Sequence, residues 1–419
     1  MKLLRYIFLA AVSACLFSCT GKKVADTSVI PLTLKILEDT TSYGYRSVAA
    51  GRAGDSRGTI AVIGAPEDAL LLSEELISCD LHDNISGTSR SDGLPDFAGE
   101  TFAEILDFAN YPYGGYLSLG NSDFLKEVNL RNFLSAVDTV CLQSPFDSTG
   151  TMFRQRAKAV IFASSSASAY GQSDIDSLLS AAGSPMAVIT PVSSMAGYVL
   201  ARRKGPVNML VWGGADNVKA DVYAPVLSGI LAERGDGSRF SVFASHSDSL
   251  DAHRQVRRAL IGLLDRYTES GGAGKIDAIL LDERGVSYDE FISAVAELQS
   301  TDEDNLLQYR NMLSEDLVCV SAARAIADEC NAWLRKYNAF THRVAYPDLK
   351  FYITYPSVNL PEDVYDVDGG FSFAYKYSRK TSAGQPDFSL VELRDRYFPE
   401  SMAEFMQSRA PKSYSIYVR

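Results

Sequence analysis

The sequence predicts an α/β fold built from two doubly wound parallel-sheet lobes. Short, fully apolar segments alternate with amphipathic helical patterns from residue 59 to residue 298, which is typical of parallel strands covered on both faces. The chain has 419 residues, 46% of them hydrophobic, which is enough for more than one core. A Gly-Pro pair at 205–206 marks the expected crossing between lobes. We therefore expect one lobe over residues 58–204 and a second over residues 205–300.

The expected elements follow from this alternation. Apolar strand patterns lie at residues 59–64, 139–143, 157–163, 186–191, 207–212, 240–244 and 276–281. Helical patterns lie between most of them, at residues 67–78, 174–182, 193–203, 221–233, 252–268 and 287–298.

Three further stretches need separate interpretation. Residues 29–38 have the pattern of a strand, and residues 41–58 are rich in Gly, Ser and Arg, as loops are. Residues 80–121 are rich in Asp, Gly, Ser and Pro and exceed an ordinary connection, which predicts a functional loop or an elaboration.

The pattern changes after residue 300. A long helical pattern covers residues 302–336, and aromatic, strand-like segments follow at 351–353, 371–373 and 414–417. We expect residues 301–419 to form an extra C-terminal α+β segment. Its aromatic side chains are expected in a core or on a sheet face, with the binding of a glycan or a partner protein as the alternative.

The N-terminus has the pattern of a secretory signal peptide. Basic residues Lys2 and Arg5 precede an apolar run at 6–17, which is too short to span a bilayer core of about 30 Å as a helix. We therefore expect residues 1–18 to be removed on export. Residues 19–57 would then form a tether and a first strand.

The end of that segment, LFSC at residues 16–19, resembles the lipobox of bacterial lipoproteins, although Phe17 is bulkier than the usual residue. The resemblance implies that Cys19 becomes the first residue and carries a diacylglyceryl group, with palmitate among its acyl chains. The expected partner is therefore membrane lipid, reached through acylation of Cys19. The expected place is the cell envelope, at the periplasmic or surface side of the outer membrane.

Charge and cysteine content exclude other classes. The formal net charge is −12, whereas a nucleic-acid partner requires a basic face. Besides Cys19, the exported chain would keep Cys79, Cys141, Cys319 and Cys330. They allow three disulfide connectivities, among which the sequence does not choose, and no CxxC pair indicates zinc or redox chemistry.

Three serines follow a predicted buried strand. Ser164, Ser165 and Ser166 come directly after residues 157–163, and ligands of open α/β sheets bind beyond the carboxyl ends of strands. Hydroxyl and backbone N–H donors at such a turn suit a carboxylate or another small anion. The alternative is that small residues here permit tight packing and the serines cap the next turn.

The segment AKAVIFASSSASAYG, residues 157–171, resembles the first catalytic strand-turn of the aspartate/glutamate racemase superfamily. The match places Ser164 on that family's first catalytic cysteine, Ser165 on its asparagine and Ser166 on its threonine. KIDAILLDERGVSYD, residues 275–289, is similar to the strand that carries the second cysteine, which falls on Glu283.

Tyr-Pro-Tyr-Gly, residues 111–114, is similar to a loop that touches substrate in glutamate racemases. The resemblance covers about residues 58–300 and implies a ligand between two lobes. The ligand-binding candidates are the three serines, Tyr113, Gly114 and Arg284.

The departures from the family argue against its reaction. Racemases of this family use two thiols on opposite faces of the substrate, and both are replaced here, by Ser164 and Glu283. A serine hydroxyl has a pKa too high to act as a base without a partner, and no histidine adjoins it in sequence. We therefore expect a protein that binds a small carboxylate or has a structural role, without a cofactor. Glu283 is the one candidate for a lone general base, with a surface carboxylate as its simpler interpretation.

Two alternatives remain open. A substrate-binding lipoprotein of the type I periplasmic kind also has two α/β lobes, but its chain crosses between them several times, whereas a racemase-like core crosses near Gly205 and returns near the end. A metal-dependent hydrolase would use the Asp80-x-His82 pair in the long loop, which is similar to the first motif of metallophosphoesterases. The downstream motifs of that family are missing, so no metal site is expected.

Overall fold

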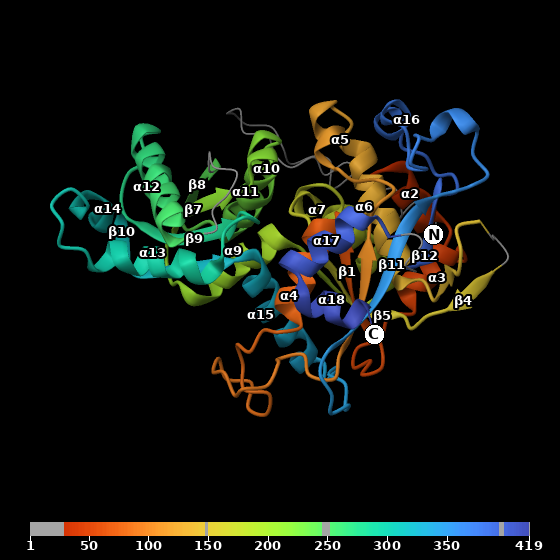
Figure 1. Ribbon diagram of the computed structural model, residues 1–419, viewed down its shortest axis with the longest axis horizontal. Coiled ribbons are helices and arrows are strands. Elements are labelled where there is room, and N and C mark those ends of the chain that lie inside the picture. The colour runs from red at the N-terminus through yellow and green to blue at the C-terminus, as the bar shows by residue number, and fades with distance from the viewer. Residues whose placement is uncertain (1–28, 147–149, 245–251, 394–397, 419) are drawn as a thin grey trace, which may run out of the picture.

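The computed structural model describes residues 29–146, 150–244, 252–393 and 398–418. The expected signal peptide and Cys19 lie outside the described residues. Figure 1 shows two lobes, each a sheet with helices on both of its faces. The predicted α/β class with two sheet-bearing lobes is confirmed.

Among the described residues, the larger sheet has eight strands, in the order β4-β3-β12-β11-β2-β1-β5-β6. Pairing is parallel except between β11 and β12 and between β3 and β4. The central strands β1, β2 and β5 are buried along their whole length, which explains their continuous apolar sequence. The strands span Thr59–Gly64 (β1), Thr101–Leu106 (β2), Val140–Leu142 (β3), Thr151–Phe153 (β4), Ala157–Phe162 (β5), Ala187–Ile189 (β6), Asp348–Pro356 (β11) and Phe388–Glu392 (β12).

Helices cover this sheet on two sides and bury an apolar cluster on each. One side carries α4 (Pro66–Leu76), α15 (Ala322–Lys336), α17 (Glu400–Arg409) and α18 (Pro411–Tyr417). The other carries α2 (Pro31–Glu38), α3 (Tyr43–Ala49), α6 (Ser122–Val137) and α8 (Gln172–Ala182). Short helices in the connections are α5 (Gly114–Ser118), α7 (Ser166–Ala169), α16 (Phe373–Ser378) and the 3-10 turn η1 (Glu362–Val364).

The smaller sheet has four parallel strands in the order β10-β9-β7-β8. They span Asn208–Gly213 (β7), Arg239–Ala244 (β8), Ile276–Asp282 (β9) and Leu313–Ser321 (β10). One face packs on α12 (His253–Glu269), α13 (Tyr288–Ser300) and α14 (Leu307–Met312). The other packs on α9 (Pro191–Arg202) and α11 (Tyr223–Arg234), and α10 (Ala215–Lys219) follows β7.

The chain crosses between the two sheets twice. It leaves the larger sheet after β6 through α9, near the predicted crossing at Gly205, and returns after β10 through α15. The two crossing helices contact each other: Ser194 Oγ donates to Glu329 Oε2 over 2.6 Å, and Arg202 pairs with Asp328 at 3.1 Å. One crossing out and one return is the pattern predicted for the racemase-like core.

Several local predictions near the N-terminus were wrong. Residues 29–38 form helix α2 rather than a strand, because Pro31 occupies its first turn and Leu32 and Ile36 face the core four residues apart. Within the expected loop 41–58, helix α3 begins after Ser42, whose side chain accepts from the Tyr45 N–H. The long segment 80–121 contains the buried strand β2, and helix α6 after it was not predicted.

The prediction of an extra segment after residue 300 is corrected by the sheet pairing. Within the expected helix 302–336, residues 313–321 form β10, which pairs with β9 of the smaller sheet. Strands β11 and β12 lie inside the larger sheet, so the C-terminal residues complete both lobes.

The aromatic tail follows the sequence expectation only in part. Residues 351–353 lie in β11, as predicted, and their side chains are buried. Phe371 forms an isolated bridge with Tyr365, and α16 begins at Phe373. Residues 414–417 form the last helix rather than a strand.

Two other features bear on the sequence expectations. No described helix combines the length and the apolar character that a membrane crossing requires. Cys79, Cys141, Cys319 and Cys330 are free, so none of the three possible connectivities is formed.

Candidate functional site

A cleft of about 640 Å³ lies where the lobes meet at the carboxyl ends of the strands. Its walls come from α4 and the residue after β5 on the larger lobe, from the loop after β9 on the smaller lobe, and from the start of the crossing helix α15. Carboxylates outnumber arginines among its lining residues: Asp68, Glu74, Glu75, Asp80, Asp282, Glu283 and Asp289 against Arg284, Arg324 and Arg409.

Ser164 lies directly behind this cleft, where β5 ends. Its Oγ donates to Asp68 Oδ2 over 2.7 Å and accepts from the Ala65 N–H over 3.2 Å. A Cβ on Gly64 would lie 3.0 Å from that same oxygen, so a glycine there lets the two strand ends approach. The hydroxyl therefore links the ends of β1 and β5 in the larger lobe. It both donates and accepts a hydrogen bond within the protein.

Ser165 reaches across to the smaller lobe. Its Oγ donates to Asp282 Oδ2 over 2.6 Å, and the Tyr223 hydroxyl donates to the same oxygen over 2.6 Å. Asp282 is the last residue of β9. Burial raises the pKa of Asp282 to about 6, against the effect of the two donors. A carboxyl with such a pKa changes charge near neutral pH.

Arg284 makes a second bridge between the lobes. Its Nη1 lies 2.6 Å from Asp68 Oδ1 on α4, while 57% of its side chain stays exposed. Burial raises the pKa of Asp68 even though Arg284 and Ser164 oppose that shift. We call Ser164, Ser165, Asp68, Asp282, Tyr223 and Arg284 together the cleft contact.

The remaining sequence candidates have other surroundings. Ser166 begins α7 and is buried, with no side-chain hydrogen bond within the described residues. Glu283 Oε1 accepts from the Gly285 N–H over 3.4 Å, and the residue lines the cleft. From the smaller lobe, the carboxylate that contacts Ser165 is Asp282, one residue before the candidate Glu283.

Tyr113 points into the larger lobe. Its hydroxyl donates to Asp107 Oδ2 over 2.8 Å, and burial raises its pKa well above the usual value. Asp107 also accepts from Asn110, Asn132 and Thr354, so Tyr113 belongs to a buried network behind β2. Gly114 is exposed at the start of α5, with open space around its Cα.

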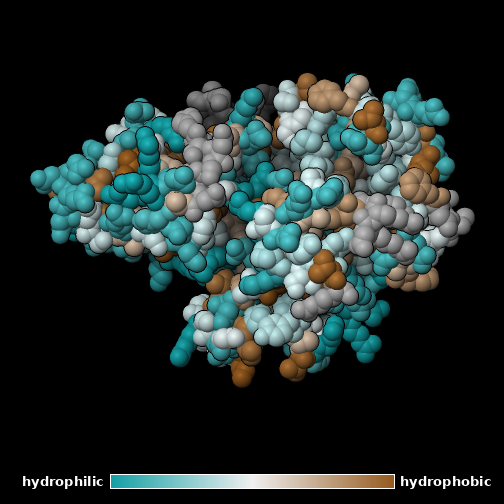
Figure 2. Space-filling model, in the orientation of Figure 1, coloured by the Kyte–Doolittle hydropathy of each residue, from teal (hydrophilic) through white to brown (hydrophobic). Residues whose placement is uncertain are grey.

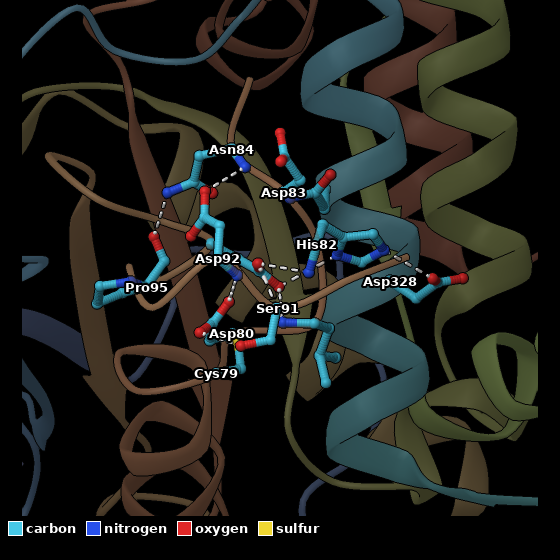
Figure 3. A network of polar contacts seen from close by, with 12 residues as sticks. Cys79, Asp80, His82, Asp83, Asn84, Ser91, Asp92, Pro95 and Asp328 are labelled. Carbon is cyan, nitrogen blue, oxygen red and sulfur yellow. Dashed lines mark hydrogen bonds and ion pairs between the residues drawn. The ribbon is translucent and has the colours of Figure 1, made fainter. Parts of the chain in front are cut away.

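The Asp80-x-His82 pair forms no metal centre. His82 lies between Asp96 Oδ2 and Asp328 Oδ1, each 3.1 Å from one ring nitrogen (Figure 3). Asp80 instead accepts from Ser91 and from the backbone of Asp92, which shapes the loop. Within the described ranges no group of three or more His, Cys, Asp or Glu side chains could hold a metal ion.

His82 instead ties the long loop to the crossing helices. Hydrogen bonds to Asp328 and Asp96 raise its pKa to about 9, so the ring is a cation at neutral pH. Asp328 lies on α15 and also pairs with Arg202 of α9. We call His82, Asp96, Asp328 and Arg202 the helix contact.

Sequence reasoning missed three residues of the site. Asp68 lies in the first turn of α4, where an acidic residue has an ordinary role beside the helix dipole. Asp282 ends an apolar strand, and this position is the one sequence feature that indicates a role in the site. Tyr223 begins α11, and nothing in its neighbourhood indicated that it reaches β9.

Comparison with known proteins gives likenesses of structure alone. No family model matches the chain, and no curated protein matches it. A glutamate racemase isoform of Bacillus anthracis is similar over 71% of this chain and 88% of its own, at 17% identity and a TM-score of 0.43.

A glutamate racemase of Francisella tularensis, solved with D-glutamate, is similar over 73% of this chain and 90% of its own, at 13% identity and a TM-score of 0.40. An aspartate racemase homologue of Pyrococcus horikoshii is similar over 67% of this chain and 99% of its own, at 15% identity and a TM-score of 0.34. The resemblance read from the sequence is found again among solved structures, at these low scores.

Proposed function

We propose that this protein is an envelope lipoprotein whose inter-lobe cleft binds a small carboxylate-bearing molecule without racemising it. The observation that carries the proposal is the cleft of about 640 Å³ at the strand ends, where the half-exposed Arg284 guanidinium lies beside Asp68. Ligands of open α/β sheets bind at such strand ends, and a guanidinium holds a carboxylate through two parallel hydrogen bonds.

The charges of the cleft define where each part of the ligand would bind. Arg284 and Arg324 are both exposed and line the cleft, so a carboxylate is best placed between them. The hydroxyls of Ser164 and Ser165 already donate to Asp68 and Asp282, so they orient these acids rather than the ligand. The surplus of acids favours an ammonium group on the same ligand. An amino-acid-like molecule combines both groups.

The chemistry of the site argues against two-base racemisation. No thiol stands at Ser164 or Glu283, and Cys79, the one cysteine among the cleft's lining residues, has its pKa raised well above the usual value by burial. Ser164 donates its proton to the Asp68 carboxylate, which is far too weak a base to convert a serine hydroxyl into the alkoxide that proton abstraction would require.

The binding part of the proposal is tested by thermal unfolding and calorimetry of the purified chain with amino acids and dicarboxylates. Arg284→Met should weaken binding of the best ligand at least tenfold, because the carboxylate loses its charged partner. Arg310→Met is the matched control, since that exposed arginine pairs with Asp302 and is not among the residues that line the cleft. If no ligand changes the unfolding midpoint or gives a heat of binding, the binding proposal is wrong and the cleft has a structural role only.

The anchoring part is tested separately in cells. The wild-type chain should incorporate labelled palmitate and fractionate with membranes, whereas Cys19→Ser should do neither. Equal labelling of both chains would contradict acylation at Cys19.

A further inference from the structure

A second cavity, of about 310 Å³, lies at the opposite end of the larger sheet from the serine turn. Its lining residues lie just before β1 and β5, at the start of β2, or in the loop before β11. It shares no residue with the inter-lobe cleft. Whatever this cavity holds is therefore independent of the proposed function.

The cavity is bordered by two arginine side chains. Arg57 and Arg343 line it, and within the part of the chain that the structure describes neither guanidinium forms an ion pair. Ser56, Gln155, Thr341 and His342 add polar hydrogen-bonding groups to its wall. The Arg343 Nη1 donates to the Thr101 hydroxyl over 3.4 Å.

The single acid of this cavity is already neutralised. Glu100 Oε2 lies 2.7 Å from Lys158 Nζ, and both side chains are almost completely buried. Glu100 Oε1 accepts from the Thr341 N–H over 2.7 Å, and Lys158 also donates to the Ala339 carbonyl. Because these charges cancel locally, the net charge of the cavity comes from the two arginines. Asp55 lies nearby, but its Oδ1 accepts from the Arg57 and Gly58 backbone N–H groups.

The loop that carries Arg343 is fixed on the sheet. The Gly99 N–H donates to the Ala345 carbonyl, and the Asp348 N–H donates to the Glu100 carbonyl. Gly99 has φ +78°, and a Cβ there would lie 2.1 Å from the Arg343 carbonyl oxygen, so only glycine permits this approach. The position of Arg343 is therefore set by backbone contacts that need no ligand.

We propose that this cavity binds a phosphate group. Two guanidiniums on one cavity supply the positive charge and the N–H donors that a phosphate dianion requires. A volume of about 310 Å³ holds the phosphate together with a small attached group. The phosphate can belong to a soluble compound or to the headgroup of a phospholipid.

The surface beside the cavity gives the lipid source a physical basis. Val344 and Tyr346 lie one and three residues after Arg343 and are 105% and 83% exposed, and Ile85 in the neighbouring loop is 94% exposed. Arg335 connects the two loops, because it donates to the Asp83 carbonyl and lies 5.6 Å from the Phe340 ring. Figure 2 shows hydrophobic side chains at the lower edge, at the tips of loops that Figure 1 draws there.

The test uses the purified full chain and two probes. Inorganic phosphate is titrated by calorimetry at constant ionic strength, and vesicles of phosphatidylglycerol are compared with vesicles of phosphatidylcholine in a pelleting assay. The wild type should bind phosphate saturably, and Arg57→Gln combined with Arg343→Gln should weaken that binding at least tenfold. Arg310→Gln is the matched control and should leave both readouts unchanged. Unfolding midpoints of all variants verify that they fold.

The vesicle assay distinguishes the two sources. If the lipid headgroup is the ligand, the double variant loses the preference for phosphatidylglycerol, and Val344→Ser lowers pelleting while phosphate binding stays unchanged. If the ligand is soluble, the double variant loses phosphate binding only. The proposal would be overturned by two results found together. The first is that the wild type does not bind phosphate, or that the double substitution leaves its phosphate binding unchanged. The second is that the double substitution also leaves the preference for phosphatidylglycerol vesicles unchanged.

Discussion

The cleft contact and the helix contact both hold the lobes and their crossing helices together, but with opposite charge arrangements. In the helix contact, one imidazolium lies between two carboxylates, and hydrogen bonds raise its pKa to about 9. In the cleft contact, two serines, a tyrosine and one arginine face Asp68 and Asp282, and burial raises the pKa of both acids. Alkali therefore weakens the helix contact, because His82 loses its proton. Mild acid instead protonates Asp68 and Asp282 and removes the free-energy cost of burying their charges. The two contacts can be titrated separately.

The largest effect is expected for His82→Gln. The substitution leaves Asp96, which is fully buried, and Asp328 without their shared cation, which costs roughly 3 kcal/mol of unfolding free energy. Because the folded pKa is raised above the unfolded value of 6.5, this stabilisation is complete below pH 6.5 and is lost as the pH rises through about 9. Urea unfolding at pH 6 and pH 9.5 measures the difference.

His253→Gln is the matched control for this prediction. His253 also lies between two carboxylates, Glu290 and Glu297, but in an exposed position on α12. It should change stability little at either pH, because solvent screens exposed pairs. If His82→Gln and His253→Gln lower the unfolding free energy equally, burial is not what makes the His82 contacts stabilising.

The next effect is expected at the cleft, for Asp282→Asn. The folded pKa of Asp282 is raised to about 6, so folding holds its proton more tightly than the unfolded chain does. Wild-type stability therefore falls as pH rises from about 4 to 6, by roughly 1.4 kcal/mol per pH unit of the shift. The variant lacks this titration, so its stability relative to wild type should be greater at pH 8 than at pH 4. Parallel stability curves would contradict the assignment.

A smaller effect is expected for Ser165→Ala. It removes one of the two donors to Asp282 and should cost about 1–2 kcal/mol at pH 8, since a hydrogen bond to a charged acceptor is lost. Ser166→Ala is the control within the same turn, because Ser166 is equally buried and makes no side-chain hydrogen bond within the described residues. Chemical denaturation of both variants checks the prediction, and equal losses would contradict it.

The smallest effect on stability is expected for Arg284→Met. More than half of the Arg284 side chain is exposed, so losing its pair with Asp68 should cost less than about 1 kcal/mol. The same change should raise the pKa of Asp68 further, since Arg284 opposes the effect of burial. NMR titration of the Asp68 carboxyl measures that shift, and an unchanged pKa would show that the pair is not formed in solution.

The sequence predicted the sheet core better than the site. Strands such as β1, β5 and β9 are continuous apolar runs, because parallel strands buried on both faces admit little else. Strand β2 was not predicted because Glu104 interrupts its apolar run, and both oxygens of that carboxylate are buried. Burial raises the pKa of Glu104 to about 8, so it is accommodated largely as a neutral acid.

The sequence predicted where the site lies but not which residues contact its serines. The serine turn follows β5 as predicted, because the end of an apolar strand is visible locally. The bond from Ser165 to Asp282 joins residues 117 positions apart, and no local pattern encodes such a pairing. The family resemblance indicated Glu283. At the end of β9, however, the side chain that reaches Ser165 is that of Asp282.

The return of the chain through α15 imposes an order on folding. The smaller sheet is built from residues 208–321 without interruption, so all of its strands are present once residue 321 has emerged. The larger sheet has β11 paired beside β2, and those strands are separated by more than 200 residues of sequence. Long-range parallel pairing of this kind is slow to form. During synthesis or export, we therefore expect the smaller lobe to fold first, while β2 keeps one edge unpaired until residues 348–356 arrive.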